Sequence, residues 1–78
     1  MTIEITAFVS DLLLSHPETM AIAERLLVDK SLLIGTESQY NEMRDACSDL
    51  LQRIGFDENY EPTKEGVALE SLIDRLLI

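Results

Sequence analysis

Cysteine, histidine, glycine and tryptophan are scarce or missing in this chain of 78 residues. The single cysteine, Cys47, excludes an internal disulfide framework and most cysteine metal sites. His16 is the only histidine, so we expect neither a multi-histidine metal site nor a histidine-paired nucleophile within one chain. The three glycines are not spaced as a dinucleotide-binding or Walker loop. We therefore expect no enzymatic activity, no cofactor and no metal.

Basic residues are also few, with 6 Lys and Arg against 15 Asp and Glu and a formal net charge of -9. Such a charge repels nucleic-acid phosphates, so we expect no direct binding to DNA or RNA. The acids have two interpretations. They keep an aliphatic-rich chain soluble, or they form a surface that binds a basic groove of a partner protein.

Long apolar runs are absent. No run approaches the roughly 20 residues needed to cross a bilayer, and no basic leader precedes an apolar stretch with a cleavage site. We expect a cytoplasmic protein, in the host-cell cytoplasm if a phage encodes it, with no membrane contact. The composition is 46% hydrophobic but only 5% aromatic, so aliphatic side chains must fill the core of a single domain spanning residues 1–78.

Apolar residues recur at helical spacing in four segments, which predicts an all-α fold: a compact bundle of about four short helices. The first helix is expected at residues 3–14, although the alternation in Ile3-Glu-Ile5-Thr also permits a short strand. Ser15-His-Pro-Glu18 has the spacing of a capping box and predicts the start of the second helix. That helix can continue to Ile34, where Gly35 stops it, or break at Asp29-Lys30-Ser31.

The third helix has the clearest pattern. Thr36-Glu-Ser-Gln39 is a second capping box, and Gly55 ends the helix. Thr63 is the expected N-cap of the fourth helix. Cys47 lies within the apolar stripe of the third helix, where burial makes the thiol inert and raises its pKa. The two apolar stripes consist of Tyr40, Met43, Cys47, Leu50, Leu51 and Ile54, and of Leu69, Leu72, Ile73, Leu76 and Leu77.

Residues 55–66 hold the richest loop chemistry in the chain. Asp57, Asn59 and Glu61 alternate as the first ligands of a calcium loop do, but Pro62 and Ala68 occupy the positions where that loop needs glycine and glutamate. A calcium site is therefore excluded.

The same residues suit a turn. Gly55 offers a left-handed stop to the third helix, and Pro62 precedes the fourth. We expect Phe56 and Tyr60 to fold back onto the core.

The stretch LLQRIGFDENYEPTKEG, residues 50–66, has a helix ending in Ile54-Gly55 and a later Pro62-Thr-x-x-Gly66. It resembles the closing part of phage antirepressor C-terminal domains, where a short hairpin separates two helices. The resemblance implies a phage or mobile-element origin and a small hairpin-like turn at residues 55–62. The chain lacks the upstream half of such a domain and is strongly acidic, so the resemblance transfers no site residue and no activity.

Acidic residues gather on one face of the third helix, opposite its apolar stripe, and continue beyond its end. Only Arg44 and Arg53 are near enough in sequence to relieve the repulsion between them. We predict that this surface binds a partner protein. Its residues are Glu42, Asp45, Asp49, Asp57, Glu58, Glu61 and Glu65.

Two functions agree with these observations. The first is a non-catalytic inhibitor of the anti-CRISPR or anti-restriction type, which blocks a basic nucleic-acid-binding groove of a host protein. The alternative is a homodimeric helical adaptor or structural protein, joined through aliphatic residues at Leu32–Ile34 and 76–78.

Overall fold

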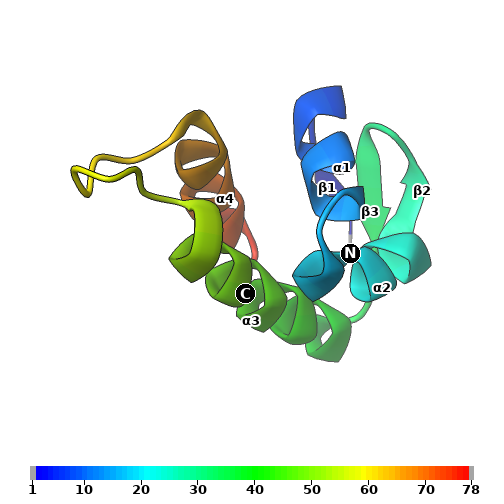
Figure 1. The fold of residues 1–78 in the computed structure, drawn as a ribbon. Coiled ribbons are helices and arrows are strands. Elements are labelled where there is room, and N and C mark those ends of the chain that lie inside the picture. Colours follow the sequence, from blue (N-terminus) through cyan, green and yellow to red (C-terminus); the bar gives the residue numbers. More distant parts are fainter. Residues whose placement is uncertain (1, 78) are drawn as a thin grey trace.

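The computed structural model describes residues 2–77 and contains four helices and a three-stranded antiparallel sheet. The all-α prediction is therefore wrong, because three short strands accompany the four helices (Figure 1). The elements in chain order are β1 (Thr2–Glu4), α1 (Ala7–Leu14), α2 (Pro17–Leu26), β2 (Leu27–Asp29), β3 (Leu32–Ile34), α3 (Glu37–Ile54) and α4 (Lys64–Arg75).

Strand β1 replaces the first turn of the helix that was expected at residues 3–14. It pairs with β3, with Ile3 opposite Leu33. The helix begins only after Thr6, whose extended backbone and hydroxyl form the N-cap; the Thr6 Oγ1 accepts a hydrogen bond from the Val9 N–H at 3.2 Å. The alternation of apolar and polar residues before Thr6 was thus the correct signal.

Strands β2 and β3 form a hairpin where a continuation of the second helix to Ile34 was one expectation. Helix α2 ends at Leu26, and the chain turns at the alternative position, residues 29–31. The Asp29 Oδ1 accepts hydrogen bonds from the backbone N–H and the hydroxyl of Ser31, both at 2.7 Å. Such a local side-chain contact offers the backbone an alternative to helix. Leu33, at the centre of β3, is fully buried.

The start of α2 differs from the predicted capping box. The N-cap is His16, which makes no side-chain cap, while the Ser15 hydroxyl donates back to the Asp11 carbonyl oxygen at 2.5 Å. Pro17 occupies the first helical turn as predicted, because its missing N–H needs no partner there.

Helices α3 and α4 begin as predicted. The Thr36 hydroxyl accepts from the Gln39 N–H at 3.1 Å and the Gln39 Oε1 accepts from the Thr36 N–H at 2.8 Å, which completes the capping box. The Thr63 hydroxyl accepts from the Gly66 N–H at 2.9 Å. Gly55 ends α3 as expected, but its φ of -73° is right-handed, so the left-handed stop was wrong.

Gly55 and Gly66 are needed because a Cβ atom at either position would overlap a backbone carbonyl oxygen. A Cβ on Gly55 would overlap the Leu51 carbonyl oxygen, and one on Gly66 would overlap the Gly55 carbonyl oxygen. The missing Cβ of Gly66 lets the start of α4 approach the backbone at the end of α3.

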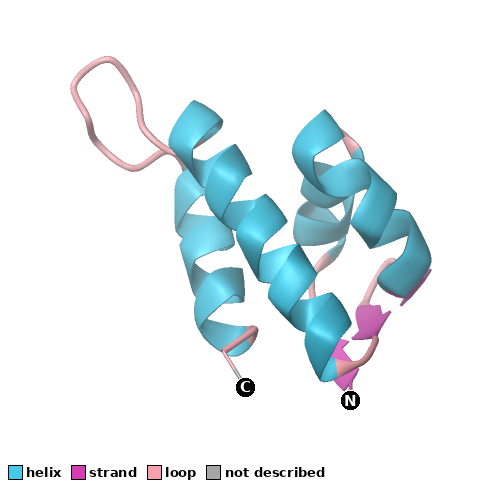
Figure 2. Cartoon of the chain, turned by 90° about the horizontal axis from the view of Figure 1, so that it is seen from below, coloured by secondary structure: helices cyan, strands magenta, loops and turns pink. Residues whose placement is uncertain are grey.

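Helix α3 is the base on which the rest of the protein packs, with α2 on one side and α4 on the other. Seen from below, α3 crosses between α4 and the N-terminal half of the fold (Figure 2). The stripe predicted for α3 is buried at four positions and half-buried at Leu51 and Ile54. The buried core consists of Ile5, Leu12, Leu13, Ile22, Ala23, Leu26, Leu33, Tyr40, Met43, Cys47, Leu50, Leu69, Leu72 and Leu76.

Candidate functional sites: an acidic face, a projecting loop and a groove

The acidic face of α3 is exposed as predicted, but one of its members is neutralised. Glu42, Asp45 and Asp49 all face solvent. The Glu42 Oε2 lies 3.1 Å from the Arg25 Nη2 on α2, an ion pair that crosses between the two helices. Among the described residues, neither Asp45 nor Asp49 has an ion-pair partner. These two carboxylates carry the free charge of this face.

Arg53 does not relieve the acidic face. Its guanidinium instead binds Glu18 on α2, with the Nε 2.5 Å and the Nη2 3.0 Å from the two carboxylate oxygens. The hydrogen bond from Arg53, together with the backbone N–H of Glu18, lowers the pKa of the Glu18 carboxyl to about 2. The pairing therefore leaves the acids near the end of α3 without this cation.

The loop between α3 and α4 projects from the body of the protein (Figures 1 and 2). A bridge between Phe56 and Pro62 makes it hairpin-like. The Asp57 Oδ1 accepts hydrogen bonds from the backbone N–H groups of Asn59 at 2.8 Å and Glu61 at 3.1 Å. Asp57 therefore fixes the shape of the loop from inside.

The aromatic residues of this projecting loop do not fold back onto the core, contrary to prediction. Phe56 is 45% exposed and Tyr60 is 87% exposed. Tyr60 has a φ of 60°, the one positive φ of a non-glycine residue in the described part of the chain. The left-handed conformation turns the chain at the tip, where the Tyr60 N–H donates to the Asp57 carbonyl oxygen at 3.0 Å.

The seven predicted acids are distributed over α3, the projecting loop and α4. Glu42, Asp45 and Asp49 lie along the shaft of α3. Asp57, Glu58 and Glu61 lie in the projecting loop, beyond the end of α3, and all three are exposed. Glu65 is half-buried in the first turn of α4.

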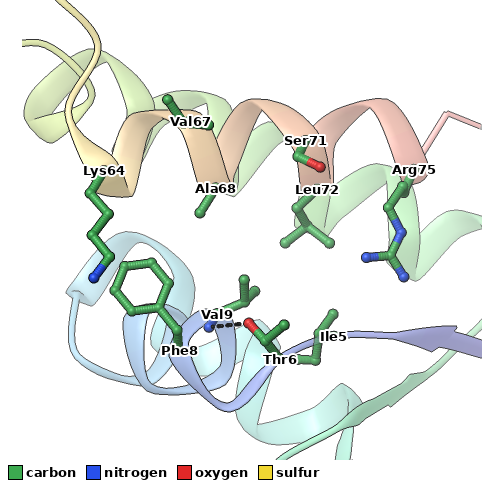
Figure 3. A pocket seen from close by; sticks show the side chains of 10 residues that line it. All are labelled: Ile5, Thr6, Phe8, Val9, Lys64, Val67, Ala68, Ser71, Leu72 and Arg75. Atoms are coloured by element: carbon green, nitrogen blue, oxygen red, sulfur yellow. Dashed lines mark hydrogen bonds between the residues drawn. The ribbon is translucent and has the colours of Figure 1, made fainter.

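Sequence reasoning missed a groove between α1 and α4, with a volume of about 390 Å³. We call it the α1–α4 groove. Figure 3 shows side chains from the start of α1 facing those of α4 across it. A signal was present, because Val67 and Ala68 widen the apolar face of α4 beyond its leucine stripe. The groove is lined by Ile5, Thr6, Phe8, Val9, Lys64, Val67, Ala68, Ser71, Leu72 and Arg75.

The thiol and one phenol of the described chain lie in the core, away from these features. Cys47 is buried as predicted, and burial raises the pKa of its thiol to about 12. The Tyr40 hydroxyl is buried and donates to the Leu33 carbonyl oxygen at 3.0 Å, and desolvation raises its pKa. Across residues 2–77, no group of three or more His, Cys, Asp or Glu side chains is placed to hold a metal ion.

Comparison of the chain with protein-family models, with curated proteins and with solved structures finds no match. Among residues 2–77, every helix is too short or too polar to span a membrane.

Proposed function

We propose that this protein is a non-catalytic protein-binding module that presents Asp45, Asp49 and the projecting loop to a basic surface of a partner protein. The observation that carries the proposal is the tip of the loop. Tyr60 is 87% exposed and holds a left-handed backbone conformation, which costs a non-glycine residue about 1–2 kcal/mol. Nothing in the described chain offsets this cost by burying the ring. Contact of the ring with a partner protein would offset the cost, because tyrosine is enriched among the residues that dominate binding energy.

The charges around the tip define the class of partner. Glu58 and Glu61 flank Tyr60 and have no ion-pair partner among the described residues. Unpaired acids attract a basic surface and accelerate encounter with it. A basic protein groove built to bind nucleic acid has the complementary charge. The proposed action is therefore inhibition: occupation of such a groove so that nucleic acid is excluded.

The resemblance of residues 50–66 to phage antirepressor domains adds a biological setting to the proposal. A phage or mobile element that encodes an inhibitor of a nucleic-acid-binding host protein would use it against CRISPR or restriction systems. This setting rests on the resemblance and on the acidic charge alone.

The adaptor alternative has less support, because two of its proposed contact residues belong to the core. Leu33 and Leu76 are fully buried, while Ile34 and Leu77 remain exposed and Ile78 lies outside the described residues. Leu32 is half-buried, so the exposed aliphatic surface that these residues offer is too small for a stable homodimer contact.

The test is affinity capture from a bacterial lysate, at low and high salt, with the wild type and an Asp45→Lys/Asp49→Lys variant. A Glu24→Lys/Glu70→Lys variant is the matched control, because it makes the same charge change at exposed acids of α2 and α4. We expect the wild type and the control to capture a nucleic-acid-binding protein that salt releases, and the α3 variant to lose it.

The captured partner protein is then purified. Its binding to a labelled oligonucleotide is measured with and without the 78-residue protein added. Displacement of the oligonucleotide supports the proposed function. Capture that ignores both salt and the α3 substitutions, or a complex that still binds the oligonucleotide, overturns it.

A further inference from the structure

The α1–α4 groove combines an apolar floor with a cation at each end. Val67 is 57% exposed and Phe8 is 39% exposed, so apolar surface is open to solvent inside it. The Lys64 Nζ lies 4.9 Å from the centroid of the Phe8 ring, and the Arg75 Nη2 donates to the Glu4 carbonyl oxygen. Figure 3 shows Lys64 and Arg75 at opposite ends of the lining face of α4.

The placement of these two cations stands out in an acidic chain. Of 6 basic residues, three are held in ion pairs with acids, namely Arg25, Lys30 and Arg53. Lys64 and Arg75 have no acidic partner among the described residues, and both line the same groove. In charge, the groove is therefore the opposite of the acidic face and the projecting loop. It is complementary to an apolar ligand that carries carboxylates at its two ends.

The groove offers side chains rather than main-chain groups to a ligand. The Thr6 hydroxyl already accepts from the Val9 N–H, and the Glu4 carbonyl oxygen at the edge of β1 already accepts from Arg75. An extended peptide gains much of its affinity from main-chain hydrogen bonds to a free strand edge, which this groove does not supply. A helix satisfies its own backbone and needs only an apolar surface.

The shape of the α4 wall also suits a helix. Its lining residues recur every three or four positions, from Lys64 through Val67, Ala68, Ser71 and Leu72 to Arg75. Such a row forms a ridge against which a second helix packs. A helix placed there would lie between α1 and α4.

We propose that the α1–α4 groove binds an amphipathic helix of a partner protein, with an apolar stripe that fills the groove and carboxylates that meet Lys64 and Arg75. These two residues are eleven positions apart, which is about 16 Å along a helix and about three turns. The partner helix therefore carries its two acids about three turns apart, on the same face as its apolar stripe. This inference goes beyond the proposed inhibitor function, because it uses the cations of the protein and a different surface.

The probe is a fluorescent peptide of about 14 residues with blocked ends, a leucine stripe and two glutamates about three turns apart. A second peptide has lysines in place of the glutamates. Binding to the full chain is measured by fluorescence anisotropy at low and high salt. We expect saturable, salt-sensitive binding of the glutamate peptide and at least tenfold weaker binding of the lysine peptide.

Two substitutions test the two parts of the groove. Val67→Glu places a charge on its apolar floor and should abolish binding of the glutamate peptide. Its matched control is Val28→Glu, because Val28 on β2 is 59% exposed and does not line the groove. Lys64→Glu should weaken binding at least tenfold, whereas Lys30→Glu, at an exposed cation outside the groove, should not. Lys64→Glu leaves the Arg75 hydrogen bond in place, and circular dichroism verifies that each variant is folded.

Three outcomes overturn the inference. They are equal binding of the two peptides, binding that survives both Val67→Glu and Lys64→Glu, and no binding of the glutamate peptide at all. Light scattering adds a fourth: a dimer that Val67→Glu dissociates would make a second copy of this chain the occupant of the groove.

Discussion

Arg53 on α3 holds Glu18 on α2 through two hydrogen bonds, from its Nε at 2.5 Å and its Nη2 at 3.0 Å. Glu18 lies in the first turn of α2, where the helix dipole also favours a carboxylate. The ion pair joins two helices that are far apart in sequence, and it raises the pKa of Arg53 as it lowers that of Glu18. This ion pair thus links α2 to α3, and it leaves the acidic residues near the end of α3 without Arg53 as a partner.

This ion pair predicts a stability that depends on pH. The pKa of Glu18 is about 2 in the folded protein and about 4.5 in the unfolded chain. The contribution is therefore present above pH 4.5 and is lost as the pH falls from 4.5 towards 2. Urea unfolding of the wild type and of Glu18→Gln should show the variant less stable at pH 7 and the gap closing below pH 4.5.

Glu24→Gln is the control for that experiment. Glu24 is an exposed acid on the same helix, and among the described residues it has no ion-pair partner. Its substitution should leave the stability nearly unchanged at both pH values. A gap between Glu18→Gln and the wild type that stays constant from pH 7 to pH 3 would contradict the assignment.

Two buried hydroxyls predict changes of opposite sign. Within the described chain the Ser10 Oγ has no hydrogen-bond partner, whereas the Thr19 Oγ1 donates to the Leu13 carbonyl oxygen at 2.6 Å. An unsatisfied buried polar group costs about 1–3 kcal/mol. We expect Ser10→Ala to raise the free energy of unfolding by about 1 kcal/mol and Thr19→Val to lower it by about 1 kcal/mol or more. Urea unfolding monitored by circular dichroism measures both, and destabilisation by Ser10→Ala would show that the hydroxyl is satisfied.

The C-terminal half of the fold could be predicted from sequence because its signals are local. The Thr36–Gln39 capping box, the apolar stripe of α3 and the Thr63 N-cap each act within a few residues, and each forms as expected. The end of α3 at Gly55 was predicted at the correct residue, but the left-handed conformation expected there was wrong. The missing Cβ of Gly55 leaves space beside the Leu51 carbonyl oxygen, and the missing Cβ of Gly66 leaves space for the Gly55 carbonyl oxygen across the α3–α4 junction. No local pattern reveals the second contact.

The N-terminal half was misread because short strands resemble pieces of helix. Three residues are too few to establish a period of two. The strands form through pairing, β1 with β3 across some thirty residues and β3 also with β2. Apolar bulk at Leu32–Ile34 was visible in the sequence, but only the pairing decides which of its side chains is buried. Ser15 likewise satisfies a capping pattern, yet its hydroxyl bonds backwards to Asp11.

The candidate sites were predictable to different degrees. Exposure of Asp45 and Asp49 follows from helical periodicity alone, and the structure agrees. The capture of Arg53 by Glu18 and the opening of a groove beside Val67 depend on how separate helices meet. Such tertiary contacts lie outside what spacing along one helix can reveal.

Burial of Cys47 predicts a chemically silent thiol. Its pKa of about 12 leaves on the order of one thiolate in ten thousand molecules at pH 8. Ellman's reagent should therefore react with the native protein more slowly by a factor of about 1,000 or more than with the protein in urea. A thiol that reacts equally fast in both states would show that the α3 stripe opens readily, and Cys47→Ala supplies the blank.

A substitution of Tyr60, at the tip of the projecting loop, should affect the stability of the protein and its binding to a partner differently. Asparagine tolerates the left-handed conformation of Tyr60 better than tyrosine does, and the exposed ring contributes little to packing. We expect Tyr60→Asn to leave the free energy of unfolding unchanged or to raise it by up to about 1 kcal/mol. If the ring is an anchor for the partner protein, the same substitution should weaken capture by about 30-fold, which corresponds to a loss of about 2 kcal/mol. The control is Val28→Asn, which removes a largely exposed apolar side chain from β2 and should leave capture intact. A folded Tyr60→Asn variant that captures the partner as well as the wild type does would leave the left-handed tyrosine without a role in binding. The proposed contact would then have to rest on the carboxylates of α3 and of the projecting loop.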